Sequence, residues 1–265
     1  MLEAVGIIPA RYGSTRFPGK PLASLEGKPL VQHVWERAAR ARKLARIIVA
    51  TDDDRIVKTV TAFGGVALLT SPDHASGTDR AEEAVRQLEA KGASIGIAVN
   101  IQGDEPLLDA GALDGLVSAL ESDPGLDYAT LAEPFSSAEE ILDPNTCKVV
   151  TDSKGFALYF SRSPIPFFRH VGAEGITPLA AGLKARPDPA AGYHRHVGIY
   201  AFRRAALAEF SRLPASKLEK LEGLEQLRVL EAGHRMRVVV SRQVTMDVDT
   251  PQDLETVRGI LAGSR

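Results

Sequence analysis

The stretch AVGIIPARYGSTRFPGKPL, residues 4–22, joins a short apolar run to a loop with two glycines, two arginines and a lysine. The apolar run has the length and composition of a buried strand. The loop is not a P-loop, because that motif reads Gly-x-x-x-x-Gly-Lys-Ser/Thr. Here five residues separate Gly13 from Gly19, and Pro21 follows Lys20. The stretch therefore predicts a strand-end loop whose cations and backbone amides suit phosphates, without the hydroxyl that a P-loop offers to magnesium.

Strand and helix patterns alternate from this loop to about residue 125. Short β-branched runs are followed by amphipathic runs with helical spacing. The predicted strands cover 46–52, 66–70 and 97–106, and the predicted helices cover 29–41, 53–65, 78–92 and 109–120. Repeated β-α-β units predict an α/β fold with a mostly parallel sheet flanked by helices.

The pattern changes after about residue 125. Closely spaced strands are expected to add an antiparallel extension that serves as a subunit interface, and 166–192, rich in Gly and Pro, is predicted to be a long surface loop. Because no linker divides the chain, we expect one domain over 1–265, with a nucleotide-binding half to about 125 and a sugar-acid-binding and dimerisation half over 126–265. The predicted strands of the second half cover 128–134, 147–152, 156–162, 196–202 and 236–241, and its helices cover 206–213, 221–233 and 251–261.

Composition restricts the possible functions. The chain has 265 residues, with 32 Lys and Arg against 34 Asp and Glu, so it has no basic footprint for nucleic acid. A single cysteine, Cys147, excludes an intramolecular disulfide. No secretory signal and no apolar run near ~20 residues is found, which predicts a cytoplasmic protein without a membrane partner.

Polar clusters follow four of the predicted parallel strands. Since ligands bind at the carboxyl ends of such strands, these clusters are expected to surround one cleft. The cations suit a polyphosphate, although the same loop composition also fits a solvated surface. The residues expected around the cleft are Arg11, Arg16, Lys20, Arg80 and Asp104.

Strand-end carboxylates are candidates for Mg²⁺, which prefers oxygen ligands. Asp104 follows an apolar strand, and the next helix has a better cap in Asp109. A second ligand could come from Asp247 or Asp249. Asp249 or Thr250 could equally cap the last helix, so spacing alone leaves metal binding and capping as equal alternatives.

Other active-site patterns are weak or missing. His194 and His196 are two residues apart, but no third His or Cys lies nearby, so the pair fits hydrogen bonding to a polar substrate better than zinc. The sequence has no Gly-x-Ser-x-Gly motif and no Gly-x-Gly-x-x-Gly after the first strand. Hydrolase and dinucleotide-dependent dehydrogenase interpretations therefore lose their main support.

Eight segments are more specific together than any is alone. They read, in order, IPARYGSTRFPGKPL, IIVATDD, HASGTDR, NIQGDEP, ALYFSRSPIP, RHVGIYAFR, LEGLEQLRVLEAG and VDTPQDLETVR. Over nearly the whole chain they resemble the 3-deoxy-manno-octulosonate cytidylyltransferases (CMP-Kdo synthetases), which make the activated Kdo used in lipopolysaccharide assembly. CMP-sialic acid synthetases share the general scheme but differ in the first loop.

The resemblance implies a nucleotidyltransferase-like Rossmannoid fold with a mixed sheet, a homodimer, CTP as co-substrate and Mg²⁺ as cofactor. It implies that Asp104 and Asp249 bind Mg²⁺ and that Gln102 lies between nucleotide and sugar acid. The implied nucleotide-binding residues are Pro9, Ala10, Arg11, Ser14, Lys20 and, in the SGTDR segment, Gly77 and Arg80. The implied Kdo-binding residues are Arg162, His196, Tyr200, Glu225 and Gln226.

The implied reaction is nucleotidyl transfer, in which the anomeric hydroxyl of Kdo attacks the α-phosphorus of CTP and pyrophosphate leaves. Lys20 and Arg11 would offset the growing charge and, with the two aspartates, form the expected catalytic set. A cytidylyltransferase for 8-amino-Kdo or a sialic acid is the nearest alternative. A sugar-1-phosphate nucleotidyltransferase fits less well, because Arg162 and His196 suit an acceptor with a carboxylate. A non-catalytic nucleotide-binding regulatory module is a third alternative.

Overall fold

Four parallel strands form the first half of the sheet in the computed structural model. The model describes residues 2–13, 16–169, 171–172, 175–176, 178–184, 186, 188, 190–241, 243 and 245–263. β1 pairs in parallel with β4 and β6, and β4 pairs in parallel with β5. The predicted parallel core is therefore confirmed. Its strands are β1 (Glu3–Pro9), β4 (Arg46–Thr51), β5 (Val66–Leu69) and β6 (Ile95–Asn100).

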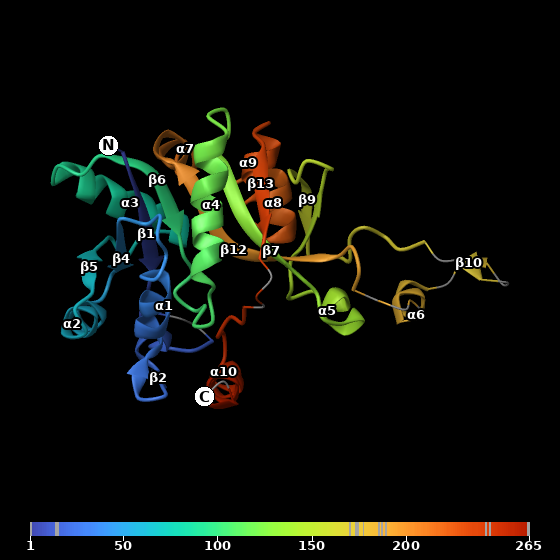
Figure 1. The fold of residues 1–265 in the computed structure, drawn as a ribbon, viewed down its shortest axis with the longest axis horizontal. Coiled ribbons are helices and arrows are strands. Elements are labelled where there is room, and N and C mark those ends of the chain that lie inside the picture. The colour runs from blue at the N-terminus through green and yellow to red at the C-terminus, as the bar shows by residue number, and fades with distance from the viewer. Residues whose placement is uncertain are drawn as a thin grey trace.

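The second half continues the same sheet with antiparallel pairings. β12 runs antiparallel to both β6 and β7, while β8 pairs with β12 and β9, and β13 is parallel to β7. The resulting order is β13-β7-β12-β6-β1-β4-β5 (Figure 1). The sheet is mixed, as expected, and joins both halves. The added strands are β7 (Tyr128–Pro134), β8 (Lys148–Thr151), β9 (Ala157–Ser161), β12 (His194–Arg203) and β13 (Met236–Val240).

Helices cover both faces of the sheet, because successive strand residues point to opposite faces and both sets are apolar. On β1, Ile8 packs with α1, α2 and α4, whereas Val5 and Ile7 pack with α3, α7 and α9. These helices are α1 (Leu30–Ala38), α2 (Asp54–Ala62), α3 (Gly77–Ala90), α4 (Ala110–Ser122), α7 (Arg204–Phe210) and α9 (Leu227–Glu231).

Two predicted segments differ from the structure. The predicted helix 221–233 is broken, because α8 (Lys217–Glu222) ends at Gly223, whose φ of 65° is left-handed and suits glycine. The predicted loop 166–192 contains a short helix and a small hairpin. The helix is held by aliphatic packing, since its Leu183 packs with Ile141 of α5. The elements concerned are α5 (Ala138–Leu142), α6 (Leu179–Lys184), β10 (Val171–Gly172) and β11 (Gly175–Ile176).

The C-terminal helix α10 (Pro251–Gly263) packs against the segment that follows the first loop. Val248 and Val257 share a buried cluster with Leu25 and Leu30, and the Val248 N–H donates to the Asp104 carbonyl at 2.9 Å. The C-terminal helix is thereby held beside residues 24–30, as Figure 1 shows for α10 and β2. The short elements here are η1 (Lys20–Leu22), β2 (Ser24–Leu25) and β3 (Lys28–Pro29).

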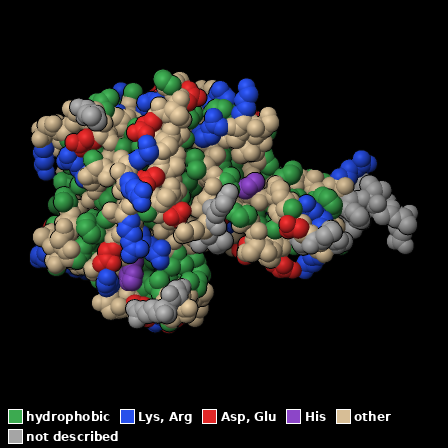
Figure 2. Space-filling view, in the orientation of Figure 1, with side chains coloured by type: hydrophobic (Ala, Val, Ile, Leu, Met, Phe, Trp, Pro, Cys, Tyr) green, Lys and Arg blue, Asp and Glu red, His purple; other side chains and the backbone are tan. Residues whose placement is uncertain are grey.

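The surface agrees with the near-neutral composition. On the face shown in Figure 2, basic and acidic side chains are interspersed, in keeping with the formal net charge of −2. Among the residues that the model describes, no helix is both long and apolar enough to cross a bilayer.

Candidate active site

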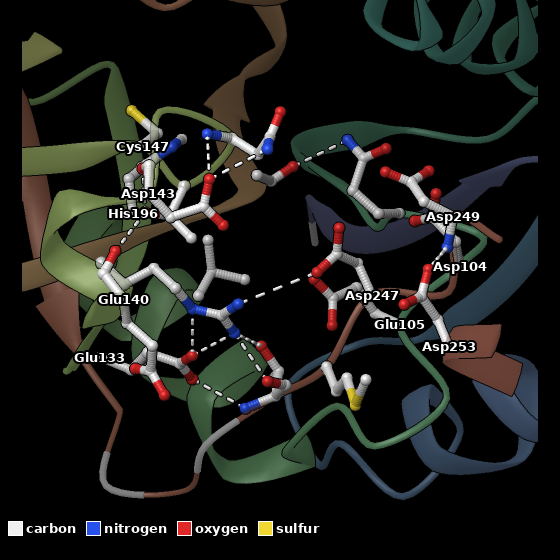
Figure 3. A pocket seen from close by; sticks show the side chains of 18 of the residues that line it. Asp104, Glu105, Glu133, Glu140, Asp143, Cys147, His196, Asp247, Asp249 and Asp253 are labelled. Carbon is white, nitrogen blue, oxygen red and sulfur yellow. Dashed lines mark hydrogen bonds and ion pairs between the residues drawn. The ribbon is translucent and has the colours of Figure 1, made fainter. Parts of the chain in front are cut away.

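Two adjoining cavities open at the carboxyl ends of the strands. The smaller has a volume of about 280 Å³ and the larger about 1470 Å³. Figure 3 shows the larger cavity, with Asp104 and Asp249 on one wall and Cys147 and His196 on the other. Ligands in the two cavities would meet where the linings overlap. The residues that line both are Arg16, Gln102, Asp104 and Asp249.

The smaller cavity gathers the strand-end residues predicted from the sequence. A Cβ at Gly103 would lie 2.7 Å from the Pro9 carbonyl oxygen, so glycine lets the loops after β1 and β6 approach each other. The predicted nucleotide residue Ser14 lies outside the described residues. The other predicted residues that line this cavity are Pro9, Ala10, Arg11, Lys20, Gly77, Arg80 and Gln102.

Arg80 is buried and held by the ends of β4 and β5. Its guanidinium donates to Thr70 Oγ1 at 2.7 Å, to the Ser71 carbonyl at 3.2 Å and to Asp52 Oδ2 at 3.1 Å. These contacts set the orientation of the charged group at the cavity wall. Neither the helix pattern nor the SGTDR segment indicated these partners, because they lie in the loops that follow β4 and β5.

Lys20 joins the two predicted metal ligands. Its Nζ lies 2.6 Å from Asp104 Oδ2 and 3.2 Å from Asp249 Oδ1, and Arg16 Nη1 lies 2.8 Å from Asp249 Oδ2. Burial alone would lower the pKa of Lys20, but the two carboxylates outweigh it and the pKa is raised. The side chain is therefore a firmly charged ammonium between two aspartates.

The capping alternative for Asp249 is resolved by Thr250. Thr250 Oγ1 accepts from the Asp253 N–H at 3.3 Å, and Asp253 Oδ2 accepts from the Thr250 N–H at 2.7 Å. This reciprocal pair satisfies the first turn of α10. The Asp249 carboxylate is thus not used as a cap.

The two aspartates fit a divalent cation. Their oxygens converge on one ammonium nitrogen, so they lie close enough to share a small cation, and carboxylate oxygen is the donor that Mg²⁺ prefers. In the described part of the chain, no group of three or more His, Cys, Asp or Glu residues could hold a metal.

The larger cavity is lined by all five residues predicted to contact the sugar acid: Arg162, His196, Tyr200, Glu225 and Gln226. Arg162 Nε donates to the Glu222 carbonyl at 2.8 Å, and its Nη1 donates to two carbonyls of the 143–146 turn. The buried Lys148 Nζ donates to the Arg162 carbonyl at 2.7 Å. These contacts hold the arginine at the cavity wall.

Three of the five are linked to one another. The Tyr200 hydroxyl donates to Gln226 Oε1 at 3.1 Å, Gln226 Nε2 lies 3.4 Å from His196 Nδ1, and His196 Nε2 lies 2.8 Å from Thr130 Oγ1. Since Thr130 donates its single proton to the Ile199 carbonyl at 3.0 Å, His196 Nε2 must be the donor to Thr130. Burial, then Arg195, lowers the pKa of His196 to about 3, so the ring is neutral.

An ionic cluster also reaches the larger cavity and was not predicted. Arg195 contacts Glu133 and donates to the Thr245 carbonyl at 2.6 Å. Glu105 is buried, with no hydrogen-bond partner for Oε2 in the described part of the chain, and burial, then Asp104 and Asp247, raises its pKa to about 8. Glu105 and Asp247 lie side by side in Figure 3. Charged residues within strands carry no local signal for such pairing.

Comparisons with known proteins agree on one family. The cytidylyltransferase family model matches residues 5–238. The chain is 52% identical over 261 residues to 3-deoxy-manno-octulosonate cytidylyltransferase of Syntrophobacter fumaroxidans, covering 98% of each chain. It is 44% identical over 257 residues to 8-amino-3,8-dideoxy-manno-octulosonate cytidylyltransferase of Shewanella baltica (strain OS195), covering 97% of each. A solved structure of CMP:2-keto-3-deoxy-manno-octonic acid synthetase complexed with CTP has a TM-score of 0.85 and 43% identity, covering 99% of this chain and 100% of that chain.

Proposed function

The chain belongs to the cytidylyltransferase family, and we infer that it is a 3-deoxy-manno-octulosonate cytidylyltransferase, a CTP-dependent nucleotidyltransferase. It joins CMP to Kdo, releases pyrophosphate and supplies activated Kdo for lipopolysaccharide assembly. The resemblance seen in the sequence is confirmed by relatives that match almost the whole chain. Since CTP is a cytoplasmic metabolite, we expect the reaction in the cytoplasm.

We propose that the two cavities divide the substrates between them. The smaller cavity, lined by the cations Arg11, Arg16 and Lys20 and by the first turn of α3, suits CTP. The larger cavity, with Arg162 and a chain of neutral hydrogen-bonding groups, suits a polyhydroxylated acid. The observation that carries this proposal is the shared lining at Gln102, Asp104 and Asp249, where the α-phosphate and the acceptor hydroxyl would meet.

The protein groups at this junction act by position and charge. Lys20, Arg11 and Arg16 would neutralise the triphosphate and the leaving pyrophosphate, so that charge development in the transition state is stabilised. Asp104 and Asp249 would hold Mg²⁺, which supplies charge neutralisation at the phosphate oxygens. Gln102 is fixed by donating from Nε2 to the Gly198 carbonyl at 2.7 Å, and it separates the two substrates.

On the acceptor side, Arg162 would pair with the carboxylate of the sugar acid and Glu225 would accept from its hydroxyls. The guanidinium already donates to backbone carbonyls, but a neutral sugar would offer it no negative charge, which favours acids over neutral sugars. Both ring nitrogens of His196 are already used, so the histidine would hold Gln226 in place. Gln226 and Tyr200 would then present the remaining lone pairs of their oxygens to the sugar.

The decisive experiment is turnover with defined acceptors. Purified protein with CTP and Mg²⁺ should convert Kdo to a product with the mass of CMP-Kdo and release pyrophosphate. The Shewanella relatives are named for 8-amino-Kdo, so this acid is the first alternative acceptor to assay. Faster turnover of 8-amino-Kdo than of Kdo would transfer the assignment to that acceptor. Absence of turnover with either acid or with a sialic acid would support a non-catalytic nucleotide-binding module.

We propose a homodimer formed through the second half of the chain. In Figure 1, α6 and β10 project from the body of the molecule. On β9, the Leu158 side chain is 62% exposed. A second copy would cover such apolar side chains. Light scattering on the purified protein should give twice the chain mass of 28.4 kDa, whereas a monomer at micromolar concentration would contradict the proposal.

A further inference from the structure

Thr78 lies on α3, in the segment that resemblance assigns to the nucleotide, yet its side chain faces elsewhere. Ser76, Gly77 and Arg80 line the smaller cavity, but Thr78 does not. It is fully buried, and its hydroxyl lies 2.7 Å from Glu225 Oε1, 147 positions away in the chain. A residue of the nucleotide segment therefore contacts a group on the acceptor side.

The direction of this hydrogen bond follows from its partners. Asn100 Nδ2 donates to Thr78 Oγ1 at 3.0 Å. A threonine hydroxyl has one proton of its own, and a carboxylate can only accept. Thr78 therefore accepts from Asn100 and donates its proton to Glu225, so the hydroxyl is oriented from both sides.

Glu225 depends on this contact more than on any other. Glu225 lies in the turn between α8 and α9. Among the described residues, its carboxylate accepts one side-chain hydrogen bond, from Thr78. Burial raises the pKa of Glu225, and the bond from Thr78 opposes this rise. One carboxylate oxygen is thus occupied by the hydroxyl, which leaves the other for a ligand in the larger cavity that Glu225 lines.

We propose that Thr78 is a positioning residue for the acceptor sugar acid, acting through Glu225, and not a nucleotide contact. The proposal rests on the function inferred above, in which Glu225 accepts from hydroxyls of the acceptor. Without the Thr78 hydroxyl, the Glu225 carboxylate is buried without a donor, and its side chain and charge are no longer held for the sugar. The cost should fall on acceptor binding.

The test compares Thr78→Val, which keeps the shape of the side chain, with Thr78→Ser, which keeps the hydroxyl. Thr78→Val should raise the KM for Kdo about tenfold or more, with the KM for CTP within about twofold of wild type. Thr78→Ser should restore the wild-type KM for Kdo. Thr61→Val, an exposed hydroxyl on α2 that donates to the Val57 carbonyl, is the matched control and should change neither constant.

A double-mutant cycle separates positioning from general damage to the fold. If Thr78 acts through Glu225, Thr78→Val should add little to the defect of Glu225→Gln. Additive effects, a rise in the KM for CTP alone, or wild-type constants in Thr78→Val would each overturn the proposal. If Thr78→Val does not fold, Thr78→Ala takes its place in the cycle. If the wild-type protein is active and Thr78→Val has unchanged constants, this inference alone is refuted. If the wild-type protein does not turn over Kdo, the proposed function is refuted as well.

Discussion

The nucleotide cavity and the acceptor cavity share a wall but are built on different principles. On the nucleotide side, Lys20, Arg16, Asp104 and Asp249 pair charge with charge, and the aspartates keep about a quarter of their side-chain surface exposed. The acceptor side also contains the Arg195–Glu133 ion pair, but its buried histidine, amide and phenol are linked by neutral hydrogen bonds. The first arrangement can exchange partners when a charged ligand arrives, whereas the second is fixed before it arrives. Substitutions in the nucleotide cavity should therefore change the kinetic constants for CTP, and substitutions in the acceptor cavity those for Kdo.

The largest effect is expected from Asp104→Asn. Loss of a metal-binding carboxylate removes charge stabilisation worth several kcal/mol, so kcat should fall about 100-fold or more in a folded protein. Steady-state rates and a thermal melt would measure this. Asp54→Asn, which changes an exposed carboxylate on α2 that lines neither cavity, is the control, and wild-type turnover by Asp104→Asn would contradict the metal assignment.

Lys20→Ala should affect the nucleotide side next most strongly. Loss of a charge-assisted contact to the triphosphate costs roughly 1.5–3 kcal/mol, which raises the KM for CTP about 10- to 150-fold. The KM for Kdo should change little. Lys58→Ala, an exposed lysine on α2, controls for net charge, and a defect confined to Kdo would show that the division of the cavities is wrong.

Arg162→Ala or Glu225→Ala should reverse this pattern. Each removes a charged group from the acceptor cavity, so the KM for Kdo should rise about 30-fold, near 2 kcal/mol, while calorimetry finds nearly unchanged CTP affinity. Arg212→Ala removes an exposed arginine that lines neither cavity and serves as control. Loss of CTP binding in a folded variant would contradict the assignment of CTP and the sugar acid to separate cavities. Equal activity with neutral sugars would contradict it as well.

The smallest effect concerns stability and pH. His196 is neutral in the folded protein because burial lowers its pKa to about 3, whereas the unfolded chain protonates near pH 6.5. Its contribution to stability is therefore present above pH 6.5 and is lost as the pH falls towards 3. Between pH 7.5 and 5.5 the loss should be about 1.4 kcal/mol, measured as a steeper fall in unfolding free energy for wild type than for His196→Gln. Parallel curves would mean that the buried neutral histidine is wrongly assigned.

The accuracy of sequence interpretation also differs between the two cavities. Arg11, Lys20, Arg80 and Asp104 each follow a strand of the parallel half, and parallel strands deliver their carboxyl ends to one edge, so the cleft could be predicted. The turn that carries Glu225 was predicted as continuous helix, because its apolar spacing continues across Gly223. The hydrogen bonds that orient the acceptor residues join segments far apart in the chain and have no local pattern.

The sequence by itself determined the β-α-β core, the strand-end loop of cations and aspartate, and the family, because these depend on local periodicity and contiguous motifs. Only the tertiary structure decided that Asp249 lies beside Lys20, since this requires α10 to pack on Leu25 and Leu30. Only the tertiary structure decided that Thr78, in a nucleotide segment, donates to Glu225. The physical reason is the same in both cases. A hydrogen bond or ion pair depends on distances of about 3 Å between side chains, and for residues distant in sequence those distances are set by the packing of helices on the sheet.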